Sequence, residues 1–329
     1  MRQMNRIARI GGVALALSFA LAPLAALSQD KWPTRPLKLV VPYAAGGPSD
    51  AAGRFIADGL TRELGQSVVV DNRPGGGASI GAAAVAKAAP DGYTFLLGHA
   101  ASVSLTPQIR KVDYDPLKDL TPVAAFASNF TLLVTRKDFG PKNMAELKAL
   151  AASKPKAVSC GTAGAGSGSH IACETLADLM GAPLLVVHYK GSAEAVTDIL
   201  AGRIDMMFDP SSLQHVKSGR LNVLAARGEG TGRFTSELPN VPSFAEQGYP
   251  TMTDGLWIGL MAPTGTPEPI LRRLATAIEK VTKAPDTAEK LLRFSQAPGY
   301  IDTAGLKSRI PDEFKQYTAL VKKLNLRAD

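Results

Sequence analysis

The stretch Leu37–Arg54, LKLVVPYAAGGPSDAAGR, decides the fold class. Its first part, Leu37–Val41, is mostly apolar and predicts a buried strand that ends at a proline. Gly46 and Gly47 then allow a tight backbone turn, and the apolar pattern that follows predicts a helix. A strand, a glycine turn and a helix in this order form a βα unit.

This turn also predicts an anion site. Ser49 or Asp50 is expected to cap the helix, which the apolar pattern continues to Leu64. Unpaired backbone N–H groups converge at such a helix start, beside the positive end of the helix dipole. They suit a carboxylate, phosphate or sulfate, whereas the alternative is an ordinary βα connection that binds nothing.

A second glycine-rich loop repeats the design at residues 159–170, SCGTAGAGSGSH. A short predicted strand leads into a flexible turn with several hydroxyl groups, and a helix is predicted at residues 172–180. Two such loops, one in each α/β unit, are expected to face each other across a cleft and to hold an anionic ligand. Two unrelated tight turns are the alternative.

Strands and helices alternate along most of the chain. Strands are predicted at residues 67–70, 93–97, 123–134, 157–160, 184–187, 204–208, 221–226 and 256–262, and the other helices at 80–88, 143–152, 193–200, 269–282, 288–294 and 310–324. This order favours largely parallel sheets, whose ligands bind beyond the carboxyl ends of the strands. Everything after residue 262 is expected to be helical.

The N-terminus predicts export from the cytoplasm. Three arginines precede an apolar run, Ile10–Leu27, and the small residues Ala26 and Ser28 fit a cleavage site before Gln29. An uncleaved membrane anchor is the alternative, because the apolar run is long for a signal. Removing the three arginines lowers the formal net charge from +8 to +5, and no basic run interleaved with aromatic residues predicts nucleic-acid binding.

Two cysteines, Cys160 and Cys173, lie in the second α/β unit. In an oxidising compartment they either pair across a short loop or remain two buried thiols, and the sequence leaves both open. Their spacing matches no redox or zinc motif.

Motifs for catalysis or for a cofactor are absent from the sequence. Ser167 lacks the outer glycines of a nucleophile elbow, and neither glycine run matches a dinucleotide or Walker loop. The four histidines, His99, His170, His188 and His215, are too widely spaced for a metal motif. We therefore expect no enzyme activity, no cofactor and no bound metal.

Two further polar residues have open roles. His170 either contacts a ligand or serves helix capping and packing. Asp209 follows a predicted strand, where it either bonds a ligand or caps the next helix, and capping is the preferred interpretation.

Ordered motifs along nearly the whole exported chain resemble the extracytoplasmic solute receptors of tripartite tricarboxylate transporters, the Bug family. They are Trp32-Pro33, Arg35-Pro36, the PYAAGG run from Pro42 with Asp50, the NRPGG run from Asn72, the PDGYT run from Pro90, Tyr114-Asp115-Pro116, Tyr189-Lys190-Gly191, the DMMFD run from Asp205 and the APTGTP run from Ala262. The resemblance implies a type II periplasmic binding protein fold, with two α/β domains around a central cleft and a two-strand hinge. The expected segments are a signal peptide at 1–28, domain 1 at 29–128 plus 253–329, and domain 2 at 129–252.

The resemblance also implies a function. The chain would be a monomeric periplasmic receptor that binds a small carboxylate and delivers it to a membrane permease. Di- and tricarboxylates, amino acids and aromatic acids all stay open as ligands. A periplasmic hydrolase of a small anionic ester is the rival, and an accessory receptor that presents its ligand to a sensor protein is a further alternative.

The ligand contacts implied by position lie in the two loops and beside them. The candidate residues are Tyr43, Ala45, Gly46, Gly47, Ser49, Asp50, His99, Ser102, Thr162, Gly166, Ser167, Ser169, His170 and Asp209. Neither loop contains Arg or Lys, so backbone N–H groups, hydroxyls and water are expected to hold the carboxylate. The chain departs from the family after the third strand, where Ala101–Pro107 replaces a His-Ala-x-Asn-Pro-like stretch, so no relative's ligand can be transferred.

Overall fold

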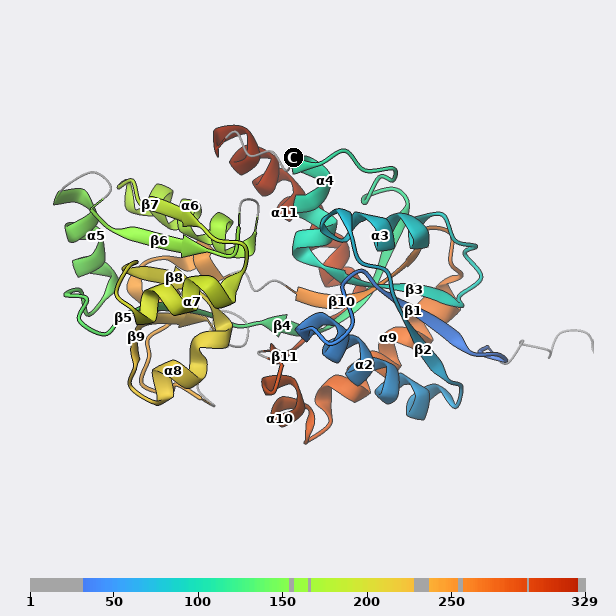
Figure 1. The fold of residues 1–329 in the computed structure, drawn as a ribbon. Coiled ribbons are helices and arrows are strands. Elements are labelled where there is room, and N and C mark those ends of the chain that lie inside the picture. Colours follow the sequence, from blue (N-terminus) through green and yellow to red (C-terminus); the bar gives the residue numbers. More distant parts are fainter. Residues whose placement is uncertain are drawn as a thin grey trace, which may run out of the picture. The chain divides into compact units, whose positions relative to one another are not determined.

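The computed structural model describes residues 32–153, 157–164, 167–227, 237–253, 257–294 and 296–324. The chain separates into two compact units, Met1–Arg35 and Pro36–Asp329, and the helices and strands of the described residues lie in the second (Figure 1). The predicted signal peptide falls outside the described residues. Within the described part, no helix combines the length and the apolar character needed to cross a membrane.

A six-stranded sheet has the order β11-β4-β10-β3-β1-β2. Its strands are β1 (Leu37–Val41), β2 (Val68–Asn72), β3 (Thr94–His99), β4 (Leu120–Asn129), β10 (Trp257–Pro263) and β11 (Gln296–Ile301). Strands β2, β1 and β3 are parallel, whereas β10 is antiparallel to both β3 and β4, and β11 is antiparallel to β4. The sheet is therefore mixed, and the prediction of a largely parallel sheet describes only its first half.

A five-stranded sheet has the order β7-β6-β8-β5-β9. Its strands are β5 (Thr131–Arg136), β6 (Ser159–Thr162), β7 (Leu185–His188), β8 (Met206–Phe208) and β9 (Leu221–Arg227). Strand β5 is antiparallel to β8 and β9, as β10 is to its neighbours in the first sheet. In each sheet, a strand of opposite direction, β10 or β5, thus lies beside the parallel βαβ core, and in the first sheet the edge strand β11 is reversed as well.

The helices largely follow the predicted alternation. They are α2 (Pro48–Leu64), α3 (Ser79–Ala86), α4 (Thr106–Ile109), α5 (Met144–Ser153), α6 (Gly168–Met180), α7 (Ser192–Leu200), α8 (Leu213–Lys217), α9 (Glu268–Lys283), α10 (Thr287–Leu292) and α11 (Thr303–Leu324). Helix α2 packs closely on α9, because a Cβ at Gly59 would lie 2.5 Å from a methyl group of Val281. Small residues therefore set how the helices cover the first sheet.

Three sequence-based boundaries were wrong. The C-terminal part is not all helical, because residues 296–301 form β11 along β4, where Pro298 and Gly299 hide the strand pattern. The apolar stretch 123–134 is two strands, with Phe130 alone between β4 and β5. Helix α11 begins at Thr303, before the predicted start at residue 310, and Pro311 lies within it.

Candidate ligand-binding site

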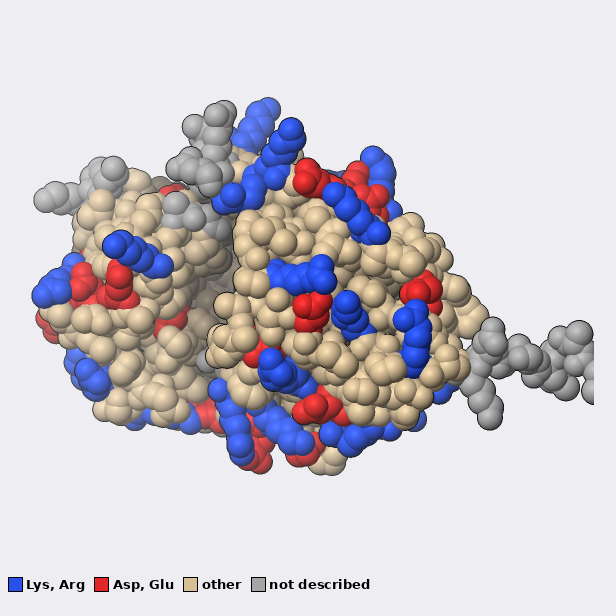
Figure 2. Space-filling view, turned by 45° about the vertical axis from the view of Figure 1, so that its right-hand side comes forward, with Lys and Arg blue, Asp and Glu red and all other residues tan. Residues whose placement is uncertain are grey.

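A cavity of about 840 Å³ receives residues from both sheets and their loops. It is lined by Pro48, Ser49, Leu105, Asn129, Phe130, Thr131, Ala163, Ser167, Gly168, Ser169, Ile171, Ala172, Thr175, Ser192, Phe208, Asp209, Pro210, Ser211, Arg227, Met252, Phe294, Gln296, Glu313, Gln316, Tyr317 and Leu320. Figure 2 shows acidic and basic side chains interspersed over the visible face, with no continuous basic patch. Among the described residues that line the cavity, only Asp209, Arg227 and Glu313 have charged side chains.

The first predicted loop, between β1 and α2, is fastened by Asp50. Its carboxylate accepts hydrogen bonds from the Gly46 N–H at 2.9 Å, from Asn72 Nδ2 at 2.9 Å and from Arg54 Nε at 3.0 Å. Burial raises the pKa of this carboxyl, but those three bonds and the Arg54 charge outweigh it, so the pKa lies below its ordinary value. Asp50 therefore holds the turn, and Arg54 reaches back to it.

The cap predicted at the start of α2 was wrong. Gly47 occupies the N-cap position without a side-chain cap, and Ser49 lies in the first turn, on the cavity wall. Gly46 has φ 84°, in the left-handed region, whereas Gly47 has φ −85°. The conformational demand for glycine is therefore at Gly46.

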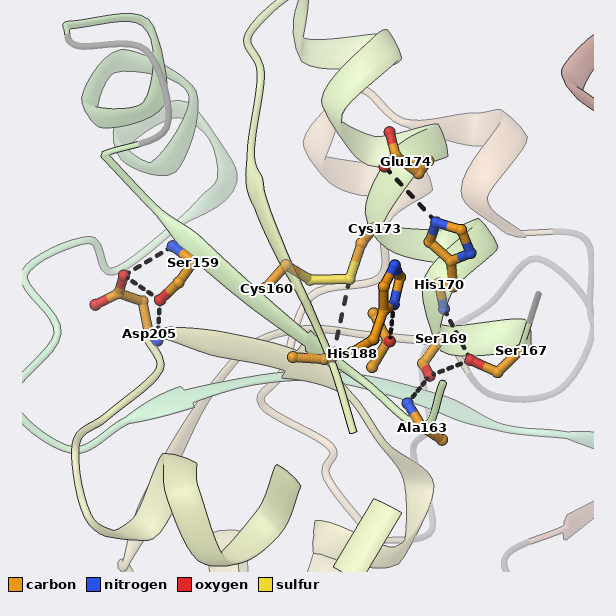
Figure 3. Close-up of a disulfide and its surroundings, with 12 residues drawn as sticks. Ser159, Cys160, Ala163, Ser167, Ser169, His170, Cys173, Glu174, His188 and Asp205 are labelled. Atoms are coloured by element: carbon orange, nitrogen blue, oxygen red, sulfur yellow. Dashed lines mark hydrogen bonds and ion pairs between the residues drawn. A yellow bond between two sulfur atoms is a disulfide. The ribbon is translucent and has the colours of Figure 1, made fainter. Parts of the chain in front are cut away.

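The second predicted loop, between β6 and α6, is fastened by hydroxyl groups (Figure 3). Ser167 is the N-cap of α6 and accepts from the His170 N–H at 3.2 Å. Ser169 Oγ accepts from the Ala163 N–H at 2.9 Å and lies 3.1 Å from Ser167 Oγ. Gly166 lies outside the described residues.

A disulfide joins the same loop to its helix. Cys160 in β6 and Cys173 in α6 are bonded, which decides between the two alternatives that the sequence left open. The bond ties the strand that enters the loop to the helix that leaves it, as Figure 3 shows.

Two helix starts therefore open on one cavity. Ser49, in the first turn of α2, lines the cavity, and so do Gly168 and Ser169 in the first turn of α6. The first N–H groups of a helix have no partner within the helix, and the dipole there favours negative charge. The arrangement suits an anion held by N–H groups and hydroxyls.

Three other predicted residues form a layer outside the cavity wall, in which His99 and Ser102 are buried and Tyr43 is partly buried. The rings of Tyr43 and His99 pack edge to face with centroids 4.9 Å apart, and Ser102 Oγ bonds the backbone of His99. Burial raises the pKa of Tyr43 to about 12 and lowers that of His99 to about 4. A neutral imidazole therefore supports the chain beside the first loop.

A histidine pair lies beside the second loop. The rings of His170 and His188 have centroids 4.6 Å apart, His188 Nδ1 lies 2.8 Å from Thr162 Oγ1, and His170 Nε2 lies 3.7 Å from Glu174. Burial, helped by His188, lowers the pKa of His170. Within the described residues, no group of three or more His, Cys, Asp or Glu side chains forms a metal site.

Asp209 lies on the cavity wall and does not cap a helix through its side chain. It occupies the N-cap position of a short 3₁₀ turn, Pro210–Ser212, but its Oδ2 accepts from the hydroxyls of Ser211 and Ser212, both at 2.6 Å. The preferred interpretation, in which Asp209 caps the next helix, was therefore wrong about the hydrogen bonds, because the carboxylate accepts from hydroxyl groups and makes no side-chain cap.

The predicted residues thus divide into two groups. Ser49, Ser167, Ser169 and Asp209 line the cavity. The others that the structure describes, which do not line it, are Tyr43, Ala45, Gly46, Gly47, Asp50, His99, Ser102, Thr162 and His170. A ligand contact by any of these residues stays a prediction.

The sequence analysis missed Arg227 and Gln296, which both line the cavity. Arg227 is 7% exposed and donates to the carbonyl oxygens of Met252 and Asn129, both at 3.3 Å, and to Thr131 Oγ1 at 3.0 Å. A signal existed for Arg227, because it is a cation at the end of an apolar strand. Gln296 gave none, since its strand was not recognised.

Relatives and solved structures agree on one class of protein. A UPF0065 protein from the TAR-I ttuE-ttuC' intergenic region of Agrobacterium vitis is 35% identical over 89% of this chain and 84% of its own length. BugT of Bordetella pertussis is 32% identical over 97% of both chains.

Solved structures of similar proteins share the fold. The periplasmic binding protein BugD is 31% identical, with a TM-score of 0.69 over 91% of this chain and 100% of its own. A Rhodopseudomonas palustris protein solved with adipate is 31% identical, with a TM-score of 0.73 over 90% of this chain and 99% of its own. MatC of the same species, solved with malate, is 30% identical, with a TM-score of 0.68 over 88% and 100%.

The family profile supplies the remaining link. It is that of the tripartite tricarboxylate transporter family receptor, TctC, and it matches residues 52–326. This range includes most of α2, all of α6, the disulfide and the strands that carry Arg227 and Gln296, whereas the first glycine loop precedes it. The chain therefore belongs to the tripartite tricarboxylate transporter receptor family, with the two-domain type II periplasmic binding protein fold.

Proposed function

We propose that this receptor binds a small carboxylate in the cavity and delivers it to the membrane permease of a tripartite tricarboxylate-type transporter. The observation that carries the proposal is the opening of two helix starts, those of α2 and α6, on one cavity. The relatives solved with adipate and malate support a carboxylate as the ligand class.

The carboxylate would be held without an ion pair from either loop. Ser49, Ser167 and Ser169 supply hydroxyls on the cavity wall, and the helix starts supply N–H groups. Tyr43, His99 and Ser102 would support the first loop from behind, and the pair Asp50 and Gly46 would fix its turn.

Binding would close two domains, at 29–128 plus 253–329 and at 129–252, around a hinge. One crossing would lie near residues 127–131, where β4 passes into β5, and the other near residues 251–255, of which 254 and 255 lie outside the described residues. Arg227 donates to backbone oxygens at both crossings, those of Asn129 and Met252, so it would hold the two hinge segments together. Small-angle scattering should show a smaller radius of gyration with saturating ligand, and an unchanged radius would count against closure.

A thermal-shift screen of carboxylates tests the ligand class, because a ligand bound only by the folded state raises the melting temperature. Dicarboxylates, tricarboxylates, amino acids and aromatic acids form the panel. No shift with any of them would overturn the proposal. Cleavage of residues 1–28 is checked by the mass of protein recovered from the periplasm.

Two other functions are separated by direct assays. Turnover of generic small esters, abolished by Ser167→Ala, would favour the hydrolase; the hydroxyl of Ser167 is engaged as a helix cap, which speaks against a nucleophile. Normal uptake in a deletion strain, with loss of a transcriptional response to the ligand, would favour presentation to a sensor protein.

A further inference from the structure

Gln296 is a buried polar residue on the cavity wall, at the start of β11. Only 1% of its surface is exposed, and its backbone pairs with Asn129 of β4. Among the described residues, nothing hydrogen-bonds its Oε1. Buried side-chain acceptors are nearly always paired in folded proteins, and Gln296 lines the cavity, so a bound ligand is a source for the donor that the described residues do not supply.

Arg227 determines which kind of hydrogen-bond donor on a ligand can lie beside Gln296. It also lines the cavity, and its guanidinium donates to the carbonyl oxygen of Asn129, so it and Gln296 flank the same residue. A ligand ammonium group beside that guanidinium would be repelled, and the repulsion is strong where water is scarce. The donor that fits is neutral, either a hydroxyl or an amide N–H.

Apolar residues surround this polar pair. Phe130 separates β4 from β5, and Phe208 and Met252 also line the cavity while being almost fully buried. Hydrogen bonds are stronger and unpaired polar groups are costlier in such a low-dielectric place. A single ligand donor can therefore decide which carboxylate is bound.

We propose that Gln296 determines the specificity of this receptor and that its ligand is a carboxylate that also bears a neutral hydrogen-bond donor, accepted by Gln296 Oε1. The inference rests on the proposed function, because the carboxylate end is assigned to the two loops. Hydroxycarboxylates and amide-bearing carboxylates are the substrate class, and Gln296 acts by direct contact.

Calorimetry on the unaltered receptor tests the preference with ligand pairs that differ by one hydroxyl. The pairs are malate and succinate, hydroxyadipate and adipate, and hydroxyphenylpropanoate and phenylpropanoate. The hydroxylated member of the pair that binds should be favoured by about fivefold to a hundredfold, because its partner leaves a buried acceptor unpaired. Aspartate, the ammonium counterpart of malate, should bind more weakly than malate.

Three variants locate the contact. Gln296→Met keeps the side-chain length but removes the acceptor, so the preference should fall to about twofold or less, with the affinity of the unhydroxylated member retained. Gln296→Glu keeps an acceptor and should keep the preference. Gln214→Leu, at an exposed glutamine of α8 that does not line the cavity, is the matched control and should leave the preference unchanged.

The outcomes separate the inference from the function on which it rests. Carboxylates that bind without any hydroxyl preference, or a preference that survives in Gln296→Met, would overturn the role of Gln296 while the receptor function stands; a bound water would then satisfy the amide. Tighter binding of aspartate than of malate would overturn the neutral donor. Absence of binding by the whole panel would overturn both.

Discussion

The two glycine-rich loops, β1–α2 and β6–α6, occupy equivalent positions in their sheets but are held by different interactions. The β1–α2 loop is held by a charged network, in which Asp50 joins the Gly46 N–H, Asn72 and Arg54. The β6–α6 loop is held by the hydroxyls of Ser167 and Ser169 and by a disulfide. The first turn of a helix beside a cavity can thus be held in place in two ways. One is a charged hydrogen-bond network, and the other combines neutral hydroxyl groups with a covalent bond.

The difference predicts which conditions damage each loop. The first loop depends on charge and on a buried neutral imidazole nearby, so it should respond to acid. The second depends on a covalent bond, so it should respond to reductant.

Removing the disulfide should have the largest effect. Its cysteines are 13 residues apart, and a loop of that length constrains the unfolded chain by about 3 kcal/mol. Cys160→Ala with Cys173→Ala should lower the free energy of unfolding by that amount in urea titrations. Reduction of the unaltered protein should reproduce the loss, and a loss below about 1 kcal/mol would contradict the prediction.

Acid should next destabilise the protein through His99, under the first loop. Burial depresses its pKa from 6.5 to about 4, so the unfolded chain binds the proton first. The contribution of neutral His99 to the free energy of unfolding is fully present above pH 6.5. It is lost as the pH falls to about 4, and the loss is up to about 3 kcal/mol. His99→Gln should flatten that part of the pH profile more than His170→Gln does; parallel profiles for His99→Gln and the unaltered protein would refute this origin.

Asp50→Ala should lower the free energy of unfolding by about 2 kcal/mol, because three donors lose the buried carboxylate that accepts their hydrogen bonds. Chemical denaturation measures the loss. Arg54→Gln is the control on the same network and should cost less, since the Arg54 side chain is 56% exposed. Equal losses would mean that the ion pair alone stabilises the loop.

Gly46→Val should cost about 1 to 2 kcal/mol, because a branched side chain disfavours the left-handed backbone at φ 84°. Gly47→Val is the matched control: that residue has φ −85°, and an added Cβ would lie at an ordinary 3.6 Å from the Ala44 carbonyl oxygen. Melting temperatures of the two variants decide the point. A larger loss at Gly47 would show that ligand-loop packing, and not φ, requires the glycine pair.

Ser167→Ala should have the smallest effect, about 1 kcal/mol of stability from the lost helix cap. Carboxylate affinity should fall by a similar amount if the hydroxyl also meets the ligand. Thermal melts and calorimetry on one preparation separate the two losses. Unchanged stability would show that the Ser169 hydroxyl replaces the cap.

Sequence reasoning predicted the two glycine loops and most of the strands, because short apolar runs that end at Gly or Pro leave a strong local pattern. Residues 37–41, 184–187 and 193–200 illustrate this, since the structure has them within one residue as β1, β7 and α7. It failed at β11, whose Pro and Gly disguise an edge strand that only pairing with β4 stabilises.

The sequence by itself determined the family, the βα rhythm and the absence of a cation in both glycine loops, because these are properties of neighbouring residues. Only the tertiary structure decided that Cys160 and Cys173 pair, that Asp50 fastens the turn, and that Arg227 and Gln296 enter the cavity. Some of these relations join residues far apart in the chain, such as the hydrogen bond between Asp50 and Asn72. They depend on strand order and on burial, which no local pattern specifies.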